Sequence, residues 1–140
     1  MSELSPYLFF DGNCAEAMRF YERTLGGKLE AMMTHADAPG GTQAPPGNAD
    51  RIMHARLVLD GGGAILASDE MAGASYAGMK EFKLSLTYKT AAEAQRVFDA
   101  LAEGGQVDLP FQKTFWSEGF GMLVDRFGTP WMVGVGGASS

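Results

Sequence analysis

Apolar residues follow two different periods along the chain, and these periods mark the predicted elements. After Asn13, apolar side chains recur every three or four positions until Gly26-Gly27, which is the spacing of an amphipathic helix. The same spacing follows Thr90 and ends at Gly104-Gly105. Asn13 and Thr90 are favourable capping residues, and each has a glutamate three positions later, as in a capping box. The sequence therefore predicts two helices that begin and end alike.

Short runs rich in aromatic and β-branched residues flank each helix and predict strands. One run precedes each helix and three follow it, so each half is predicted to fold as β-α-β-β-β. The predicted strands are 7–10, 28–33, 52–59 and 64–68 in the first half, and 82–88, 106–111, 120–124 and 131–135 in the second. The run 106–111 carries the weakest signal of these strands.

The two halves also match residue by residue, which indicates an internal duplication. The matched residues are Ala15-Glu16-Ala17 with Ala92-Glu93-Ala94, Arg19 with Arg96, Tyr21 with Phe98, Glu22 with Asp99, and Gly27 with Gly104. Every one of these pairs is 77 positions apart, and the turns 60–63 and 125–128 correspond at an offset of 65. We therefore expect an α+β fold in one domain over 1–140, with unit one at about 1–68, a connector at 69–81 and unit two at about 82–136.

Composition narrows the class of protein. The chain has 140 residues, of which 46% are hydrophobic and 20% charged, as in an ordinary globular domain. A net charge of −6 argues against nucleic-acid binding, and no apolar run is long enough for a membrane span. The N-terminus has no signal-peptide pattern, and the single cysteine, Cys14, cannot form an internal disulfide. We expect a cytoplasmic protein with no nucleic-acid or membrane partner.

Several short motifs resemble those of a known superfamily. Phe20-Tyr21 followed by Leu25-Gly26, and Asp125-Arg126-Phe127-Gly128 before the last strand, are similar to the vicinal oxygen chelate superfamily of glyoxalase I, extradiol dioxygenases and bleomycin-resistance proteins. A closer resemblance is to its PhnB-like branch. The residues that carry it are Ser5-Pro6-Tyr7-Leu8, Gly12-Asn13-Cys14-Ala15, Ile52-Met53-His54-Ala55, Ser68-Asp69, Lys113-Thr114-Phe115-Trp116, Gly119-Phe120-Gly121 and Phe127-Gly128-Thr129-Pro130-Trp131-Met132. The resemblance implies curved mixed sheets, a homodimer and a small-molecule ligand.

The resemblance also implies where a metal would bind. Enzymes of the superfamily hold a divalent cation through one side chain from the first and one from the last strand of each unit. Those positions align with Pro6, Ala67, Lys83 and Met132. None of the four suits a hard cation, and a slip of one residue to Ser68 or Leu84 does not create a ligand set. His35 and His54 do not form a short ligand pair either. We expect no metal and no other cofactor.

The alternation of side chains on the strands assigns residues to an expected cavity. The residues expected to contact the helices are one alternating row on each strand: Met53, Ala55, Leu57 and Leu59, and Phe82, Leu84, Leu86 and Tyr88. The side chains left for the cavity are His54 and Arg56, then Lys83, Ser85 and Thr87, with Ser68 beside them. These donors indicate a small anionic or oxygen-rich ligand. The alternative is a solvated face with incidental charges.

Three further sites have alternative interpretations. Trp116 stands in a polar, turn-like stretch and is a candidate for stacking on a ligand, although aromatic clusters more often form a core or a dimer interface. Cys14 lies in the first turn of a helix, where the dipole lowers a thiol pKa, but it has no identifiable histidine partner. Asp69-Glu70 is either a general base or, more commonly for adjacent carboxylates, solvated.

These observations together predict a PhnB-like homodimer that binds a small molecule in a cavity capped by the loop 34–51, which is rich in Gly, Pro and Ala. The predicted ligand-binding residues are His54, Arg56, Ser68, Lys83, Ser85 and Trp116. One alternative is a metal-dependent lyase, isomerase or dioxygenase with a non-standard ligand set around His54. Another is a partner-binding module without a cavity. The sequence leaves open whether the protein is an enzyme.

Overall fold

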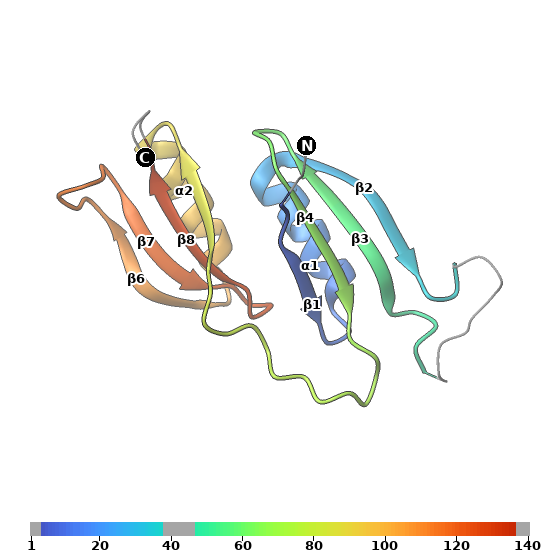
Figure 1. Ribbon diagram of the computed structural model, residues 1–140. Helices are drawn as coiled ribbons and strands as arrows, with labels where there is room; N and C mark the ends of the chain where they lie inside the picture. Colours follow the sequence, from blue (N-terminus) through green and yellow to red (C-terminus); the bar gives the residue numbers. More distant parts are fainter. Residues whose placement is uncertain (1–3, 38–46, 137–140) are drawn as a thin grey trace. The chain divides into compact units, whose positions relative to one another are not determined.

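The computed structural model describes residues 4–37 and 47–136. The chain divides into two compact units, residues 1–78 and 79–140. Each unit has a four-stranded mixed sheet with one face covered by a helix (Figure 1). The predicted α+β fold with tandem units is therefore confirmed. Residues 38–46, in the middle of the predicted loop 34–51, lie outside the described residues.

Unit one contains β1 (Tyr7–Phe10), α1 (Cys14–Tyr21), the π-helix η1 (Glu22–Gly26), β2 (Gly27–Thr34), β3 (Ile52–Leu59) and β4 (Ala64–Asp69). The strand order is β1-β4-β3-β2, in which β1 is parallel to β4 and the other pairs are antiparallel. Alternate residues of the sheet point towards α1 and are apolar. The buried residues on this face include Leu8, Phe10, Ala55, Leu57 and Ala67.

Unit two contains β5 (Leu84–Tyr88), α2 (Ala91–Ala102), β6 (Gln106–Gln112), β7 (Phe120–Val124) and β8 (Pro130–Val135). Its strand order, β5-β8-β7-β6, has the same pattern of parallel and antiparallel pairs as unit one. The apolar stripe of α2 packs on this sheet, with Val97 and Leu101 buried on the helix and Trp131 and Val133 buried on β8.

The predicted strands are all present, and β1, β3 and β7 have the predicted bounds. At the start of α2, Thr90 Oγ1 accepts a hydrogen bond from the backbone N–H of Glu93 (3.2 Å), as the capping pattern predicted. Asn13 occupies the equivalent position of α1, but its side chain makes no capping hydrogen bond. The predicted capping box of the first helix is therefore wrong, and the first N–H group of the helix, that of Cys14, is instead accepted by Asp69 Oδ1 (3.0 Å).

The equivalence of the two units differs by one residue from the predicted alignment of the turns. Across one turn Leu59 N–H donates to Gly63 O (3.0 Å), and across the other Asp125 N–H donates to Thr129 O (2.9 Å). Leu59 therefore corresponds to Asp125, and the offset is 66 rather than 65. Both turns contain an aspartate followed three residues later by a glycine, and this similarity led to the alignment of Asp60 with Asp125. The hydrogen bonds do not support that alignment.

A similar correction applies at the ends of the helices. Gly26 and Gly104 both have a left-handed backbone, with φ of 81° and 76°, and they are 78 positions apart. The predicted match of Gly27 with Gly104 is therefore wrong, and Gly27 corresponds to Gly105. The reason is that the second unit has one more residue between the helix cap and the terminating glycine.

Among the described residues, no helix is both long and apolar enough to cross a membrane.

Candidate functional site

The sheet face opposite α2, called here the open face of unit two, carries polar residues that the sequence assigned to a binding site. On β5, Ser85 and Thr87 are exposed, and the residues that alternate with them, Leu84, Leu86 and Tyr88, are half-buried, as the alternation predicted. Lys83 immediately precedes β5 and is also exposed. Strand pairing sets Met132 beside Ser85 and Met122 beside Met132. The open face therefore combines a lysine and hydroxyls with two thioethers.

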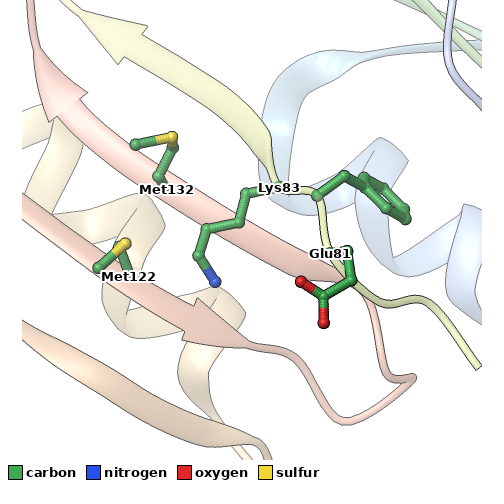
Figure 2. Close-up of a pocket in the computed structure, with 5 residues that line it drawn as sticks. Glu81, Lys83, Met122 and Met132 are labelled. Atoms are coloured by element: carbon green, nitrogen blue, oxygen red, sulfur yellow. The ribbon is translucent and has the colours of Figure 1, made fainter.

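A pocket of about 520 Å³ opens on this face and is lined by Glu81, Phe82, Lys83, Met122 and Met132. Figure 2 shows Lys83 and the two methionines projecting from the sheet on the same side, with the carboxylate of Glu81 facing the same space. The volume lies within the range of small-molecule sites. The methionines give the pocket an apolar, adaptable floor. The arrangement suits a small ligand with a charged group.

The two charged residues of the pocket have an unusual local structure. Within the described residues of unit two, Glu81 and Lys83 form no ion pair and no side-chain hydrogen bond. Glu81 has φ of 63° and is the one non-glycine residue with positive φ in the described ranges. Such a conformation costs a non-glycine residue on the order of 1 kcal/mol or more, and strain of this kind gathers at ligand sites.

Phe82 does not lie where the alternation placed it. It was expected to contact the helix, but β5 begins only at Leu84, and Phe82 is 44% exposed and lines the pocket. Met122 was missed as well, although the pairing of β7 with β8 sets it beside Met132. No sequence pattern predicted that Glu81 would line the pocket. Its position depends on a positive φ, a conformation that glutamate rarely adopts.

Trp116 lies outside the residues that line the pocket. It is 60% exposed, and its ring centroid is 4.8 Å from that of Phe115 and 5.8 Å from that of Phe120. The loop that carries it is held by Ser117, whose Oγ donates to Gly119 O (2.7 Å). The loop therefore presents its aromatic side chains to solvent on a hydrogen-bonded backbone.

His54 lies on β3 in unit one, on the sheet face opposite α1. Its ring centroid is 6.2 Å from that of Tyr7, which in turn is 5.0 Å from that of Phe9. Tyr7 and Phe9 are 41% and 46% exposed. This face of unit one therefore presents a row of rings to solvent. In the described residues, His54 contacts another aromatic ring rather than a carboxylate.

Arg56 and Ser68 belong to the same face of unit one. Arg56 Nε is 3.4 Å from Glu30 Oε1, so its charge already has a counter-ion. Ser68 is buried on β4. The predicted site residues thus fall into two sets: His54, Arg56 and Ser68 in unit one, and Lys83, Ser85 and Trp116 in unit two.

The strand register corrects the positions that the resemblance assigned to a metal. The turn hydrogen bonds set the offset at 66, so Ala67 corresponds to Val133, and the residues paired with them on the first strands, Leu8 and Leu86, are 78 positions apart. Ala67 is fully buried on the helix side, whereas Met132 lies on the open face. The predicted set therefore mixed the two faces of the sheet.

The donor chemistry does not fit a divalent metal on either alignment. By the observed offsets, Lys83 and Met132 correspond to Ser5 and Leu66. A protonated amine and an aliphatic side chain cannot coordinate, and a thioether binds hard cations poorly. The described ranges also contain no group of three or more His, Cys, Asp and Glu residues that could hold a metal ion. No chemical step is assigned to a metal here.

Cys14 is fully buried in the first turn of α1. Burial, reinforced by the negative charge of Asp69, raises the pKa of its thiol to about 12, so lowering by the helix dipole does not occur. Asp69 itself is buried rather than solvated. Its carboxylate accepts hydrogen bonds from the backbone N–H groups of Gly12 (2.9 Å), Cys14 (3.0 Å) and Ile52 (2.9 Å). Both residues are structural.

Comparison with known proteins places this architecture in a family. The model of the Glyoxalase/Bleomycin resistance protein/Dioxygenase superfamily matches residues 3–133. The chain belongs to this superfamily. Among its relatives is Protein YjdN of Escherichia coli (strain K12), which is 39% identical over 142 residues covering 94% of each chain.

Two solved structures have the same fold. Protein PA1353 from Pseudomonas aeruginosa has a TM-score of 0.88 and 47% identity, covering 96% of this chain and 98% of that chain. A putative 3-demethylubiquinone-9 3-methyltransferase, PhnB protein, from Bacillus cereus has a TM-score of 0.82 and 24% identity, covering 96% and 100%. The predicted PhnB-like membership of the superfamily is confirmed.

Proposed function

We propose that this glyoxalase-superfamily protein binds a small anionic or oxygen-rich molecule and that the pocket of unit two holds its charged group. The observation that carries the proposal is Lys83, whose ammonium group faces the pocket without a counter-ion among the described residues of that unit. A protein with a net charge of −6 attracts anions only where a cation is locally dominant. On the open face the ammonium group of Lys83 is available to attract an anionic group, although the pocket also contains the carboxylate of Glu81.

The neighbours of Lys83 support this assignment. Ser85 lies on the same face of β5 and has a hydroxyl that can donate to a ligand oxygen. Met122 and Met132 give one side of the pocket an apolar surface, and a less polar surrounding strengthens the attraction between an ammonium group and an anion. The pocket therefore combines one charge-assisted contact with apolar packing, as small-molecule sites commonly do.

The other predicted residues take lesser roles in the proposal. Trp116 on unit two is proposed as a further ligand contact. The binding roles expected for His54, Arg56 and Ser68 on unit one stay predictions, and Glu30 already neutralises part of the charge of Arg56. The expected homodimer and the loop 34–51 as a cap stay predictions. Sedimentation equilibrium tests the dimer directly.

We propose binding without the four-ligand metal centre and without methyl transfer. The metal positions have unsuitable donors. A nucleotide-type methyl donor would need free N–H groups at a helix N-terminus after a glycine-rich turn. In α1 the Asp69 carboxylate already accepts the N–H groups of Gly12 and Cys14.

The test compares Lys83→Gln with Lys89→Gln, which removes an equal charge from unit two outside the pocket. A panel of small carboxylates and organic phosphates is screened by thermal shift, and affinities are measured by calorimetry. We expect Lys83→Gln to weaken binding about 10- to 100-fold, the effect of one charge-assisted hydrogen bond, and Lys89→Gln to bind normally. Equal losses in the two variants, or no binding by the wild type, would contradict the proposal.

A further inference from the structure

The pocket of unit two holds two opposite charges that do not neutralise each other. Glu81 and Lys83 are two positions apart, and both line the pocket. Figure 2 shows the carboxylate and the amino group as separate features of the same space. If the only role of Glu81 were to balance Lys83, an ion pair between them would be expected. Among the described residues of unit two no such pair forms.

The backbone of Glu81 gives a second, independent observation. At φ of 63° glycine or asparagine would be the favoured residue, yet the chain has a glutamate whose carboxylate lines the pocket. Residues with backbone strain of this kind cluster at active sites and ligand-binding positions. We therefore infer that the carboxylate of Glu81 has a function in the pocket, beyond any role of this residue in the turn.

The two charges set requirements on a ligand. A simple anion bound to Lys83 would also meet the negative field of Glu81, which weakens its binding. A ligand that carries an ammonium group as well as an anionic group satisfies both side chains. Met122 and Met132, which line the same pocket, can contact a short apolar body that joins the two groups.

We propose that the pocket selects small zwitterions, with Lys83 binding the anionic group of the ligand and Glu81 binding a protonated amine of the same molecule. This rests on the proposed function, because it assumes that the pocket binds a ligand, and it adds the chemical class of that ligand. Glu81 is thus a specificity-determining residue for the site.

The experiment uses the full chain with ¹³C-methyl-labelled methionine, so that the Met122 and Met132 methyl signals report on the pocket directly. The probes are β-alanine, 4-aminobutyrate and 6-aminohexanoate, each beside the carboxylate that lacks its amino group. At least one amino acid of the series is expected to bind the wild type about tenfold more tightly than its deaminated partner. Glu81→Gln is expected to abolish this preference while the plain carboxylates bind at least as well as before.

Two controls separate recognition from folding. Glu103→Gln removes an exposed carboxylate of unit two outside the pocket and should leave every affinity unchanged. Glu81→Gly should raise the midpoint of thermal unfolding, because glycine accepts the left-handed backbone, and should still lose the preference for the amine. A residue that served only the turn would not combine a gain in stability with a loss of selectivity.

The outcomes distinguish the two proposals. If plain carboxylates bind as tightly as all their amino derivatives, or if Glu81→Gln keeps the preference, the zwitterion inference is wrong and anion binding stands. If no probe shifts the Met122 and Met132 signals and the wider anion panel also fails, the proposed function is wrong as well.

Discussion

The two units share one topology, yet each buries a different aspartate in a different place. In unit one the buried carboxylate is Asp69, at the end of β4, and in unit two it is Asp125, in the turn between β7 and β8. By the observed offset of 66, Asp69 corresponds to Val135 and Asp125 corresponds to Leu59. Neither carboxylate therefore has a counterpart in the other unit.

The two aspartates also differ in what they join. Asp69 accepts N–H groups from the turn before α1 and from the start of β3, segments 55 and 17 residues away for Cys14 and Ile52. Asp125 accepts the N–H groups of Phe127 (2.9 Å) and Thr129 (3.0 Å) within its own turn, and the indole Nε1–H of Trp131 (2.8 Å). One carboxylate is a long-range clamp and the other organises a local turn.

The difference shows how duplicated units diverge. The helix of unit two is capped by its own Thr90, so no remote acceptor is needed there. In unit one the side chain of Asn13 makes no capping hydrogen bond, and Asp69 at the end of β4 accepts the N–H of Cys14, the first residue of the helix. Topology is shared because it depends on many apolar contacts, whereas polar groups are satisfied one by one.

The largest expected effects come from removing the buried carboxylates. Asp69→Ala and Asp125→Ala should each lower the free energy of unfolding by about 3 kcal/mol, because buried N–H groups lose their acceptor. Urea unfolding measures the loss. Hydrogen exchange should show faster exchange at Gly12, Cys14 and Ile52 in the first variant only. If either variant increased the exchange rates equally in both units, the stabilising effect of each carboxylate would not be confined to its own unit.

A smaller effect tests the corrected equivalence of the glycines. A Cβ atom at Gly27 would meet the carbonyl oxygen of Val58, and one at Gly105 would meet that of Val124. Gly27→Ala and Gly105→Ala should therefore lose a similar amount of stability, about 2 kcal/mol each. Gly61→Ala is the control, because nothing lies within 4 Å of its added Cβ. A large loss in only one of the paired variants would break the equivalence.

The smallest effect concerns Cys14, which unit two lacks. Its pKa in the folded protein is raised to about 12 from 9.0, so the stability gained by burying the neutral thiol is complete below pH 9 and falls as pH rises towards 12. Between pH 9 and 10 the wild type should lose about 1 kcal/mol more than Cys14→Ala. Parallel denaturation curves at these two pH values measure the difference. Identical losses in wild type and variant would show that the thiol does not titrate with unfolding.

Much of the fold was predictable because its signals are local. The bounds of β1, β3 and β7 follow from the alternation within each strand, and the Thr90 cap lies three residues from the N–H that it accepts. The exposed positions of Ser85 and Thr87 were predicted for the same reason. Asp69 was not, since a carboxylate followed by Glu70 is usually solvated and its partners lie elsewhere in the chain.

The candidate site was predictable only in part. Lys83 was predicted as a ligand-binding residue from the alternation along its strand, whereas Met132 was considered only as a metal position with an unsuitable donor. Met122 joins them through strand pairing, and Glu81 through a backbone conformation that no sequence period encodes. A one-residue error in the offset was enough to place Ala67 on the wrong face, since side chains alternate along a strand.

The sequence by itself determined the β-α-β-β-β units, their duplication and the polar face of β5, because helix and strand periods are properties of consecutive residues. Only the tertiary structure decided that Asp69 caps α1, that Asp125 holds Trp131, and that Glu81 shares a pocket with Lys83. These contacts depend on strand register and on backbone conformation. Both are set by tertiary packing, which brings together residues that are far apart in the sequence or held in rare conformations.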